Sequence, residues 1–355
     1  MRRTAGRLLV GAVSLTLLAG SCGGGAGAEG VDPERPASEV EPPPGLDVKR
    51  TGLPGLILAT NSASLRRVAR SPEGEGAVVL FVAPGGPFDG LGVGRGDLIT
   101  AVGGEDIRSH PRALALLHDR PGKSIEVSIR HRDGRERSIE VEPKEPLVTS
   151  LRQYLNPLVG ASPRDPVLRF LRAQSPGLYN AKLVDLEEAL KLDRRFVEAL
   201  TLRASLIWDN KPNDQERQPR FVEEALSGWK SALQIDPDNT TTLATRSTVL
   251  STLGSAQQAR RDAAKVIELD PTHPRGYYAL AVAEDALKRP ERAVAPARDA
   301  ITLDPFNNTY WRLLARLFKD LKRLPDCRRT TAAFAPFLEA QKFDEDADSL
   351  KAICR

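Results

Sequence analysis

The chain has 355 residues, of which 41% are hydrophobic and 28% charged, which suits a globular protein of about two domains. Three of its positive charges, Arg2, Arg3 and Arg7, lie in a segment that we expect to be removed, so the formal charge of +4 overstates the mature charge. A near-neutral chain gives no electrostatic basis for nucleic-acid binding. The three cysteines form no Cys-x-x-Cys pair, which excludes a zinc ribbon and a thioredoxin-like site.

The first 21 residues have the pattern of a signal peptide. Residues 1–7 carry three arginines and no acid, and residues 8–20 are uncharged and mostly apolar. This apolar stretch is too short for a helix that crosses a membrane, which needs about 20 residues. A basic start followed by a short apolar stretch predicts a secretory signal over residues 1–21.

The end of that segment, LAGSC over residues 18–22, resembles the lipobox of bacterial lipoproteins, although Ala19 stands where the strongest lipoboxes have leucine. The resemblance implies cleavage before Cys22 and attachment of a lipid to its thiol. The protein would then lie outside the cytoplasm, anchored to a membrane of the bacterial cell envelope. An ordinary secretory signal with an incidental cysteine is the alternative. Residues 22–50, rich in glycine, proline and acids, predict a disordered tether.

Residues 51–146 are predicted to form a small β domain with short helices. Apolar runs at 76–84 and 96–104 have the composition of strands that end in turns. The segment 124–143 alternates apolar and polar residues on both sides of an Asp-Gly turn, which predicts a hairpin. Between the strands, the segment 111–118 begins with proline and predicts a short helix.

Several residues in this order resemble the PDZ domains of bacterial envelope proteases. The matching stretches are VAPGGP at 82–87, GL at 90–91, GRGDLI at 94–99 and VGG at 102–104. PDZ domains bind an extended peptide as an added strand, beside one of their own strands and against a helix. The resemblance implies one peptide-binding domain over most of residues 51–146.

The family binds the terminal carboxylate of the peptide on a glycine-containing loop before the groove strand. The corresponding stretch here runs from Leu53 to Leu56. Pro54 has no N–H to donate, so Gly55 and Leu56 would supply the donors. Alternation along the strand places Leu56 and Leu58 on the same side.

On the helix, Leu114 and Leu117 are predicted to face the core, which turns Ala115 and His118 toward the groove. Leu53, Leu56 and Leu58 would then form an apolar wall opposite Ala115. This arrangement predicts a ligand with an apolar C-terminal residue. The alternative is that the leucines fill the core of a domain that has lost its ligand.

Residues 166–345 show a period of 34 residues. Asp-Pro pairs begin at Asp236, Asp270 and Asp304, and an alanine recurs twelve residues before each proline. A helix–turn–helix period of this length, with small residues where helices cross, resembles TPR repeats. The predicted fold is therefore multidomain α+β: a PDZ-like small β domain with short helices, a linker at 147–165, an all-α TPR-like solenoid at 166–345 and a tail at 346–355.

A TPR array presents a concave face to its partner. By phase with the family, this face takes Arg312, Arg316 and Lys319 from the last full unit, and Arg275 and Tyr278 from the unit before. A basic stripe with a tyrosine suits an acidic protein segment. A solvated helix face is the alternative.

Cys327 and Cys354 are predicted to form a disulfide. An exported protein meets an environment in which disulfides persist. The bridge would hold down a chain end with little apolar content. Two unpaired thiols are the alternative.

Motifs of enzymes are missing from the sequence, which has no His-Glu-x-x-His, Gly-x-Ser-x-Gly or phosphate-binding glycine loop. We therefore expect no catalytic residues, metal or cofactor. The predicted function is a lipid-anchored extracytoplasmic scaffold. It would bind protein C-termini or extended peptides through the PDZ groove and a protein partner through the repeats. The alternative is a non-catalytic regulatory or substrate-delivery subunit of a separate membrane protease.

Overall fold

The structure is a computed structural model, and the residues it describes are 55–118, 124–142, 151–212, 217–340 and 343–355. They divide into two compact units. One unit comprises the described residues of 150–237 and is all helical. The other comprises the sheet domain, residues 55–142, and the helices of 238–355. The predicted signal peptide, Cys22, the tether and Leu53 lie outside the described residues.

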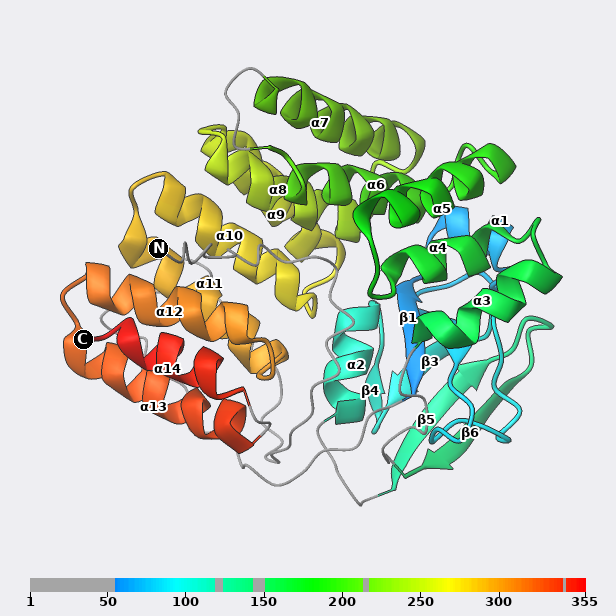
Figure 1. Ribbon diagram of the computed structural model, residues 1–355. Helices are drawn as coiled ribbons and strands as arrows, with labels where there is room; N and C mark the ends of the chain where they lie inside the picture. The colour runs from blue at the N-terminus through cyan, green and yellow to red at the C-terminus, as the bar shows by residue number, and fades with distance from the viewer. Residues whose placement is uncertain (1–54, 119–123, 143–150, 213–216, 341–342) are drawn as a thin grey trace, which may run out of the picture. The chain divides into compact units, whose positions relative to one another are not determined.

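The sheet domain is an antiparallel sheet with two short helices (Figure 1). Its strands pair in the order β1-β2-β3-β5-β6, and the short β4 pairs with β3, so β1 is an edge strand among the described residues. The elements are β1 (Leu56–Thr60), α1 (Ala63–Val68), β2 (Ala77–Val82), β3 (Leu98–Val102), β4 (Glu105–Asp106), α2 (His110–His118), β5 (Ile125–Arg130) and β6 (Glu136–Val141).

The β5–β6 hairpin follows the alternation seen in the sequence. Ile125, Val127 and Ile129 are buried in the domain core, and the residues between them are more exposed. Gly134 in the turn has a φ of +85°, a left-handed conformation that favours glycine. The predicted hairpin is therefore confirmed.

Helix α2 packs on the sheet through a different pair from the one predicted. Ala113 and Leu117 are buried in the domain core, whereas Leu114 is only partly buried against it. Residues four apart lie on the same face of a helix, and Ala113 with Leu117 makes such a pair. Leu117 is therefore confirmed as a core residue, Leu114 packs against the core while only partly buried, and Ala113 is a further core residue that was not predicted.

The rest of the described chain is helical. The first unit contains α3 (Leu151–Ala161), α4 (Pro166–Gln174), α5 (Tyr179–Leu192), α6 (Val197–Asp209) and α7 (Gln218–Ile235). The second contains α8 (Thr240–Thr252), α9 (Ala256–Leu269), α10 (Pro274–Ala286), α11 (Pro290–Leu303), α12 (Asn308–Asp320), α13 (Leu324–Ala340) and α14 (Asp344–Ala352). Helix α3 occupies much of the segment predicted as a linker, and α14 occupies most of the predicted tail.

The 34-residue period appears in the structure as repeated packing and repeated helix ends. Ala225, Ala259 and Ala293 are fully buried. Asp236, Asp270 and Asp304 each end a helix in an extended or near-extended conformation. The residue before a proline avoids helical geometry, which explains why each helix ends there. The Asp-Pro pairs therefore set the helix lengths.

The same period fixes hydrogen bonds and turns. The Tyr277 hydroxyl donates to the Pro271 carbonyl at 3.0 Å, and the Trp311 Nε1–H donates to the Pro305 carbonyl at 2.7 Å. Thus the aromatic residue six positions after each of these prolines ties its helix to the preceding turn. Positive φ also recurs every 34 residues in the turns, at Gly254, Lys288 and Lys322.

The C-terminal end of the chain is packed rather than loose. Ala347 and Leu350 of α14 are buried, and α14 contacts α13. A disulfide joins Cys327 to Cys354, whose Cα atoms are 5.8 Å apart. The last helix is therefore attached both by apolar burial and by a covalent bond.

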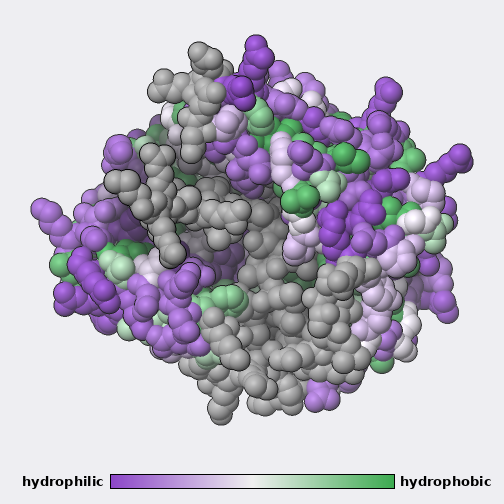
Figure 2. Space-filling view, in the orientation of Figure 1, coloured by the Kyte–Doolittle hydropathy of each residue, from purple (hydrophilic) through white to green (hydrophobic). Residues whose placement is uncertain are grey.

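The described surface is mixed, and a few large apolar side chains, such as Leu178 and Val184, are exposed on it. Figure 2 shows hydrophilic side chains over most of the coloured surface, with apolar ones in small separate patches. None of the helices in the described part of the chain has the length and apolar character that a membrane crossing needs.

Candidate functional site

The first candidate site is the edge of strand β1 beside helix α2. Strand β1 pairs with β2 along one side, from Leu56↔Val82 to Thr60↔Ala77, and has no strand on its other side among the described residues. Helix α2 contacts β1. An edge strand next to a helix is the arrangement in which a peptide adds as a further strand.

Gly55 stands at the start of β1 with a φ of +62°. A Cβ at this position would lie 3.1 Å from Pro87 Cδ and 3.3 Å from the Gly86 Cα. The Gly55 carbonyl accepts a hydrogen bond from the Ala83 N–H at 2.7 Å. Glycine is therefore required here both by the backbone conformation and by the close approach of residues 86–87.

Apolar side chains flank this edge. Leu58 is buried in the domain core, and Leu56, Leu114 and Leu117 pack in or against the same core. Ala115 is also buried, but it does not belong to that core. The side chain of His118 lies outside the described residues. The predicted facing of Ala115 and His118 toward the ligand stays a prediction.

The first residue of α2 ties the helix to the end of β1. The His110 N–H donates to Thr60 Oγ1 at 3.2 Å, and His110 Nδ1 lies 2.9 Å from the same oxygen. Burial lowers the pKa of His110 to about 3, and electrostatic interactions with His273 and Arg275 act in the same direction. The imidazole is therefore neutral at physiological pH and can accept the hydrogen bond from the threonine hydroxyl.

Arg112, on the next part of α2, links this helix to the repeat helices of the same unit. Its guanidinium donates twice to the Glu105 carboxylate, both at 2.7 Å, and once to the Leu303 carbonyl at 2.9 Å. The Leu303 carbonyl is one of the last in α11, where carbonyls lack a partner within the helix. Arg112 therefore caps a repeat helix while it is held by the sheet domain.

The second candidate site is the basic stripe predicted on the repeats. Arg316 pairs with Asp285 at 2.8 Å, and Arg275 donates to Thr245 Oγ1 at 3.0 Å. Tyr278 lies against Tyr310 with ring centroids 5.2 Å apart, and burial raises the pKa of its hydroxyl. Each of these three side chains thus contacts a neighbouring repeat helix.

The remaining two residues of the stripe contact the C-terminal segment. Arg312 donates to the Asp346 carboxylate at 3.2 Å and to the Ser349 hydroxyl at 3.0 Å, both on α14. The Lys319 ammonium lies 3.5 Å from the Arg355 carbonyl oxygen. The acidic segment that contacts this stripe in the structure is therefore the chain's own last helix, which begins Asp344-Glu345-Asp346.

A third feature, which the sequence analysis did not single out, is a concavity of about 900 Å³ on the sheet domain. We call it the hairpin concavity. It is lined by the loop 92–97, the hairpin residues 131–137 and Arg70. Its signal in the sequence is a run of four arginines within residues 130–137. Three of them, Arg132, Arg135 and Arg137, line the concavity with Arg70.

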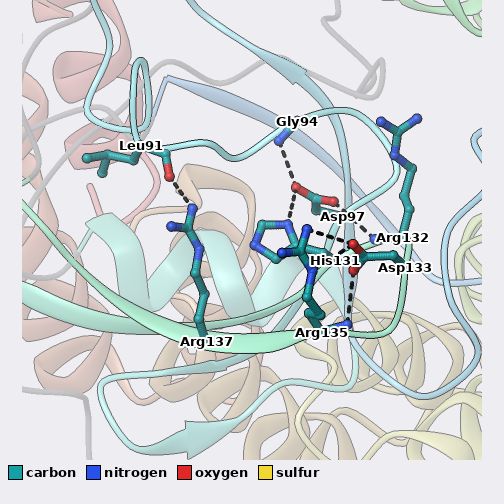
Figure 3. A network of polar contacts seen from close by, with 8 residues as sticks. All are labelled: Leu91, Gly94, Asp97, His131, Arg132, Asp133, Arg135 and Arg137. Atoms are coloured by element: carbon teal, nitrogen blue, oxygen red, sulfur yellow. Dashed lines mark hydrogen bonds and ion pairs between the residues drawn. The ribbon is translucent and has the colours of Figure 1, made fainter.

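The carboxylates of the concavity are engaged by the protein itself (Figure 3). Asp97 accepts from the Gly94 N–H at 2.9 Å and from the Arg132 N–H at 3.3 Å, and it lies 3.0 Å from His131 Nδ1. Asp133 accepts from the Arg135 N–H at 3.1 Å and from its Nε at 2.7 Å, and these bonds lower the pKa of the Asp133 carboxyl. Asp97, from the GRGDLI stretch, therefore fixes the loop against the hairpin.

The described residues contain no group of three or more His, Cys, Asp or Glu side chains arranged to bind a metal ion.

Comparison with known proteins identifies the sheet domain. Residues 55–142 match the family model for the PDZ domain. The match covers the whole described sheet, including the β1 edge and the hairpin concavity. The chain therefore contains a PDZ domain where its sequence resembles one.

Parts of the chain also match two curated proteins. The chain is 35% identical over 153 residues to a DnaJ homolog subfamily C member 7 homolog of Schizosaccharomyces pombe. This alignment covers 41% of this chain and 32% of that protein. The chain is also 28% identical over 97 residues to a Hsp70-Hsp90 organizing protein of Triticum aestivum. That alignment covers 27% of this chain and 16% of the other protein. The chain thus spans about a third or less of the length of these relatives.

Among solved structures, a thermophilic TPR protein of Thermus thermophilus aligns with a TM-score of 0.43 at 21% identity, over 48% of this chain and 88% of that one. The PilF protein of Pseudomonas aeruginosa aligns with a TM-score of 0.37 at 18% identity, over 57% and 88%. The chain combines a PDZ domain with a TPR-like helical region.

Proposed function

We propose that this protein is a non-catalytic scaffold whose PDZ domain binds the apolar C-terminus of a partner protein at the β1 edge. The observation that supports this most directly is the edge strand β1, beside α2, with Gly55 in the left-handed conformation at its start. A peptide strand added there would exchange backbone hydrogen bonds with β1. The N–H groups of Gly55 and Leu56 would donate to its terminal carboxylate.

The specificity would come from the leucines at this edge. Leu56 and Leu114 are partly buried against the core, so each retains surface that a ligand side chain could cover. Covering apolar surface stabilises a complex by roughly 25 cal/mol per Å². An apolar last residue would gain this energy, whereas a charged one would lose its hydration without a partner.

Several sequence features support a membrane-anchored location. The basic and apolar start, the lipobox-like LAGSC at 18–22 and the polar tether at 22–50 occur in the order found in a lipoprotein. We propose that Cys22 is lipidated and that the scaffold works at a membrane of the bacterial cell envelope. The Cys22→Ala variant should then appear in the soluble fraction or keep its signal peptide. If it still partitions with the membranes in mature form, the anchor is wrong.

The peptide proposal is tested with a library of peptides that have free C-termini, screened against the mature chain. We expect binders with an apolar last residue, and we expect amidation of the carboxylate to weaken them. Gly55→Val should abolish binding because its Cβ would meet residues 86–87.

The matched control is Gly104→Val. Gly104 also has a positive φ, of +84°, but open space surrounds its Cβ position. Both variants therefore place strain on the backbone, and only Gly55→Val disturbs the β1 edge. Equal loss of binding in the two variants, or equal binding of amidated and free peptides, would contradict the proposed mode. A protease that co-purifies with the native protein would favour the substrate-delivery role over a general scaffold.

A further inference from the structure

The hairpin concavity has the features of an anion site that is separate from the β1 edge. It lies between the loop 92–97 and the β5–β6 hairpin, and four arginines line it. We propose that it binds a phosphate ester, with Arg70 and Arg132 as the main donors. The proposal does not depend on peptide binding at β1 or on the lipid anchor.

The first argument is the state of the charges around the concavity. Its three carboxylates, Asp97, Asp133 and Glu136, accept hydrogen bonds from protein groups, with Glu136 taking one from Arg130 at 2.6 Å. By contrast, within the part of the chain that the structure describes, the guanidinium groups of Arg70 and Arg132 have no hydrogen bond or ion pair. The concavity therefore holds positive charge that its own acids do not neutralise.

The second argument is that two glycines make room for two of the arginines. A Cβ on Gly96, where φ is +93°, would lie 2.6 Å from Cδ of Arg132. A Cβ on Gly92, where φ is +69°, would lie 3.1 Å from Nη2 of Arg137, which donates to the Leu91 carbonyl. Because glycine has no side chain at these two positions, the arginine side chains lie directly against the backbone. This packing limits their conformational freedom before a ligand binds.

Arg70 reaches the concavity through an unusual backbone conformation. It follows the last turn of α1 with a φ of +59°, a region that is unfavourable for a residue with a Cβ. The Cβ position of Gly96 lies 2.4 Å from the carbonyl oxygen of the neighbouring Ala69, so the end of α1 packs directly on the loop of the concavity. Arg70 follows directly after Ala69 and lines the concavity together with the hairpin arginines.

The chemistry of these donors selects the class of ligand. A guanidinium presents a planar fork of N–H groups that matches the oxygens of a phosphate. Arg70, which follows α1, and the arginines of the hairpin line one hollow instead of following a strand, which suits a compact tetrahedral group better than an extended acidic peptide. A volume of about 900 Å³ holds more than a single ion. The ester group beyond the phosphate would fill the remainder.

Two sources carry this chemistry, a soluble phosphate ester and a lipid headgroup. The test therefore measures binding of the full mature chain, with its lipid-attachment cysteine replaced, to glycerol phosphate by calorimetry and to phosphatidylglycerol vesicles by sedimentation. Arg70→Gln with Arg132→Gln should weaken binding by about tenfold or more. The control is Arg66→Gln with Arg108→Gln, which removes the same charge from the same domain outside the concavity and should change binding by less than about twofold.

Binding of glycerol phosphate that needs Arg70 and Arg132 would support a soluble ligand, and binding confined to the vesicles with the same dependence would support a headgroup. The proposal is overturned if neither probe binds, or if both double variants lose affinity equally. It is also overturned if citrate competes as well as glycerol phosphate, since the site would then recognise charge alone. Thermal melting of each variant confirms that the domain is folded.

Discussion

Two groups of basic residues in this protein look alike in the sequence and differ in the structure. Arg312, Arg316 and Lys319 follow one face of a repeat helix, and each contacts an oxygen of the chain. Arg70 and Arg132 line the hairpin concavity, where the carboxylates accept hydrogen bonds from other residues and not from these two guanidinium groups. Basic residues on a repeat helix pack beside the neighbouring helices and the chain end, whose carboxylate and carbonyl oxygens then lie within contact distance. At the hairpin concavity Arg135 and Arg137 are engaged by protein oxygens, whereas the guanidinium groups of Arg70 and Arg132 have no partner among the described residues.

Because the repeat helix α12 binds α14 through Arg312, α14 packs as part of the repeat region. Removing the disulfide that attaches α14 should therefore have the largest effect on stability. Replacing both Cys327 and Cys354 with serine should lower the free energy of unfolding of the C-terminal helices by about 3–4 kcal/mol, as expected for a closed loop of this length. Denaturant unfolding measures the change. Alkylation of the parent protein before and after reduction, read by intact mass, checks the bond: two thiols labelled without reductant would rule it out.

The repeat region also buries titratable groups, so its stability should depend on pH. The pKa of His273 is lowered to about 4, chiefly by burial; the charge of Asp270 opposes this shift and that of Arg275 contributes to it. The unfolded chain takes up a proton near pH 6.5 and the folded chain does not, so stability should fall between about pH 6.5 and 4. The slope is at most about 1.4 kcal/mol per pH unit.

Three other groups bear on this slope, and one of them is Asp209, whose pKa burial raises to about 7, so that its protonation favours the folded state as the pH falls. His110, whose pKa is lowered to about 3, acts in the same direction as His273. Asp304, whose pKa burial raises to about 6, acts in the opposite direction, because its protonation favours the folded protein as the pH falls. The measurement is therefore the difference between His273→Gln and the parent in denaturant unfolding at several pH values. The variant should show the shallower loss toward low pH, and Thr272→Ser, which removes no titratable group, should match the parent. An unchanged slope in His273→Gln would contradict the prediction.

The smallest effects compare the two basic groups directly. Arg312→Ala removes hydrogen bonds to Asp346 and Ser349 and should lower the free energy of unfolding by about 1–2 kcal/mol. Arg132→Ala should change it by less than about 0.5 kcal/mol, because its guanidinium has no partner among the described residues. Parallel thermal and denaturant melts check both variants. A larger loss in Arg132→Ala than in Arg312→Ala would reverse the comparison.

Much of the fold was predictable because its determinants are local. The Asp-Pro pairs end helices wherever they stand, since a proline restricts the residue before it, and their 34-residue spacing predicted the repeats. Alternating Ile125, Val127 and Ile129 predicted the hairpin, and Gly55 marked the start of the edge strand. In each case the residue type directly restricts the backbone conformation at its own position or at the adjacent one.

Only the tertiary structure decided which charges are neutralised. Arg312 and Asp346 are 34 residues apart, as are Asp97 and His131, and no local pattern states that either pair meets. The burial of Ala113, which the sequence analysis did not predict, likewise depends on how α2 packs on the sheet. The sequence alone thus predicted the repeat period and the hairpin, although it did not predict helices α3 and α14. The availability of an arginine to a ligand depends on what the fold places beside it, because a Coulomb interaction acts through space and not along the chain.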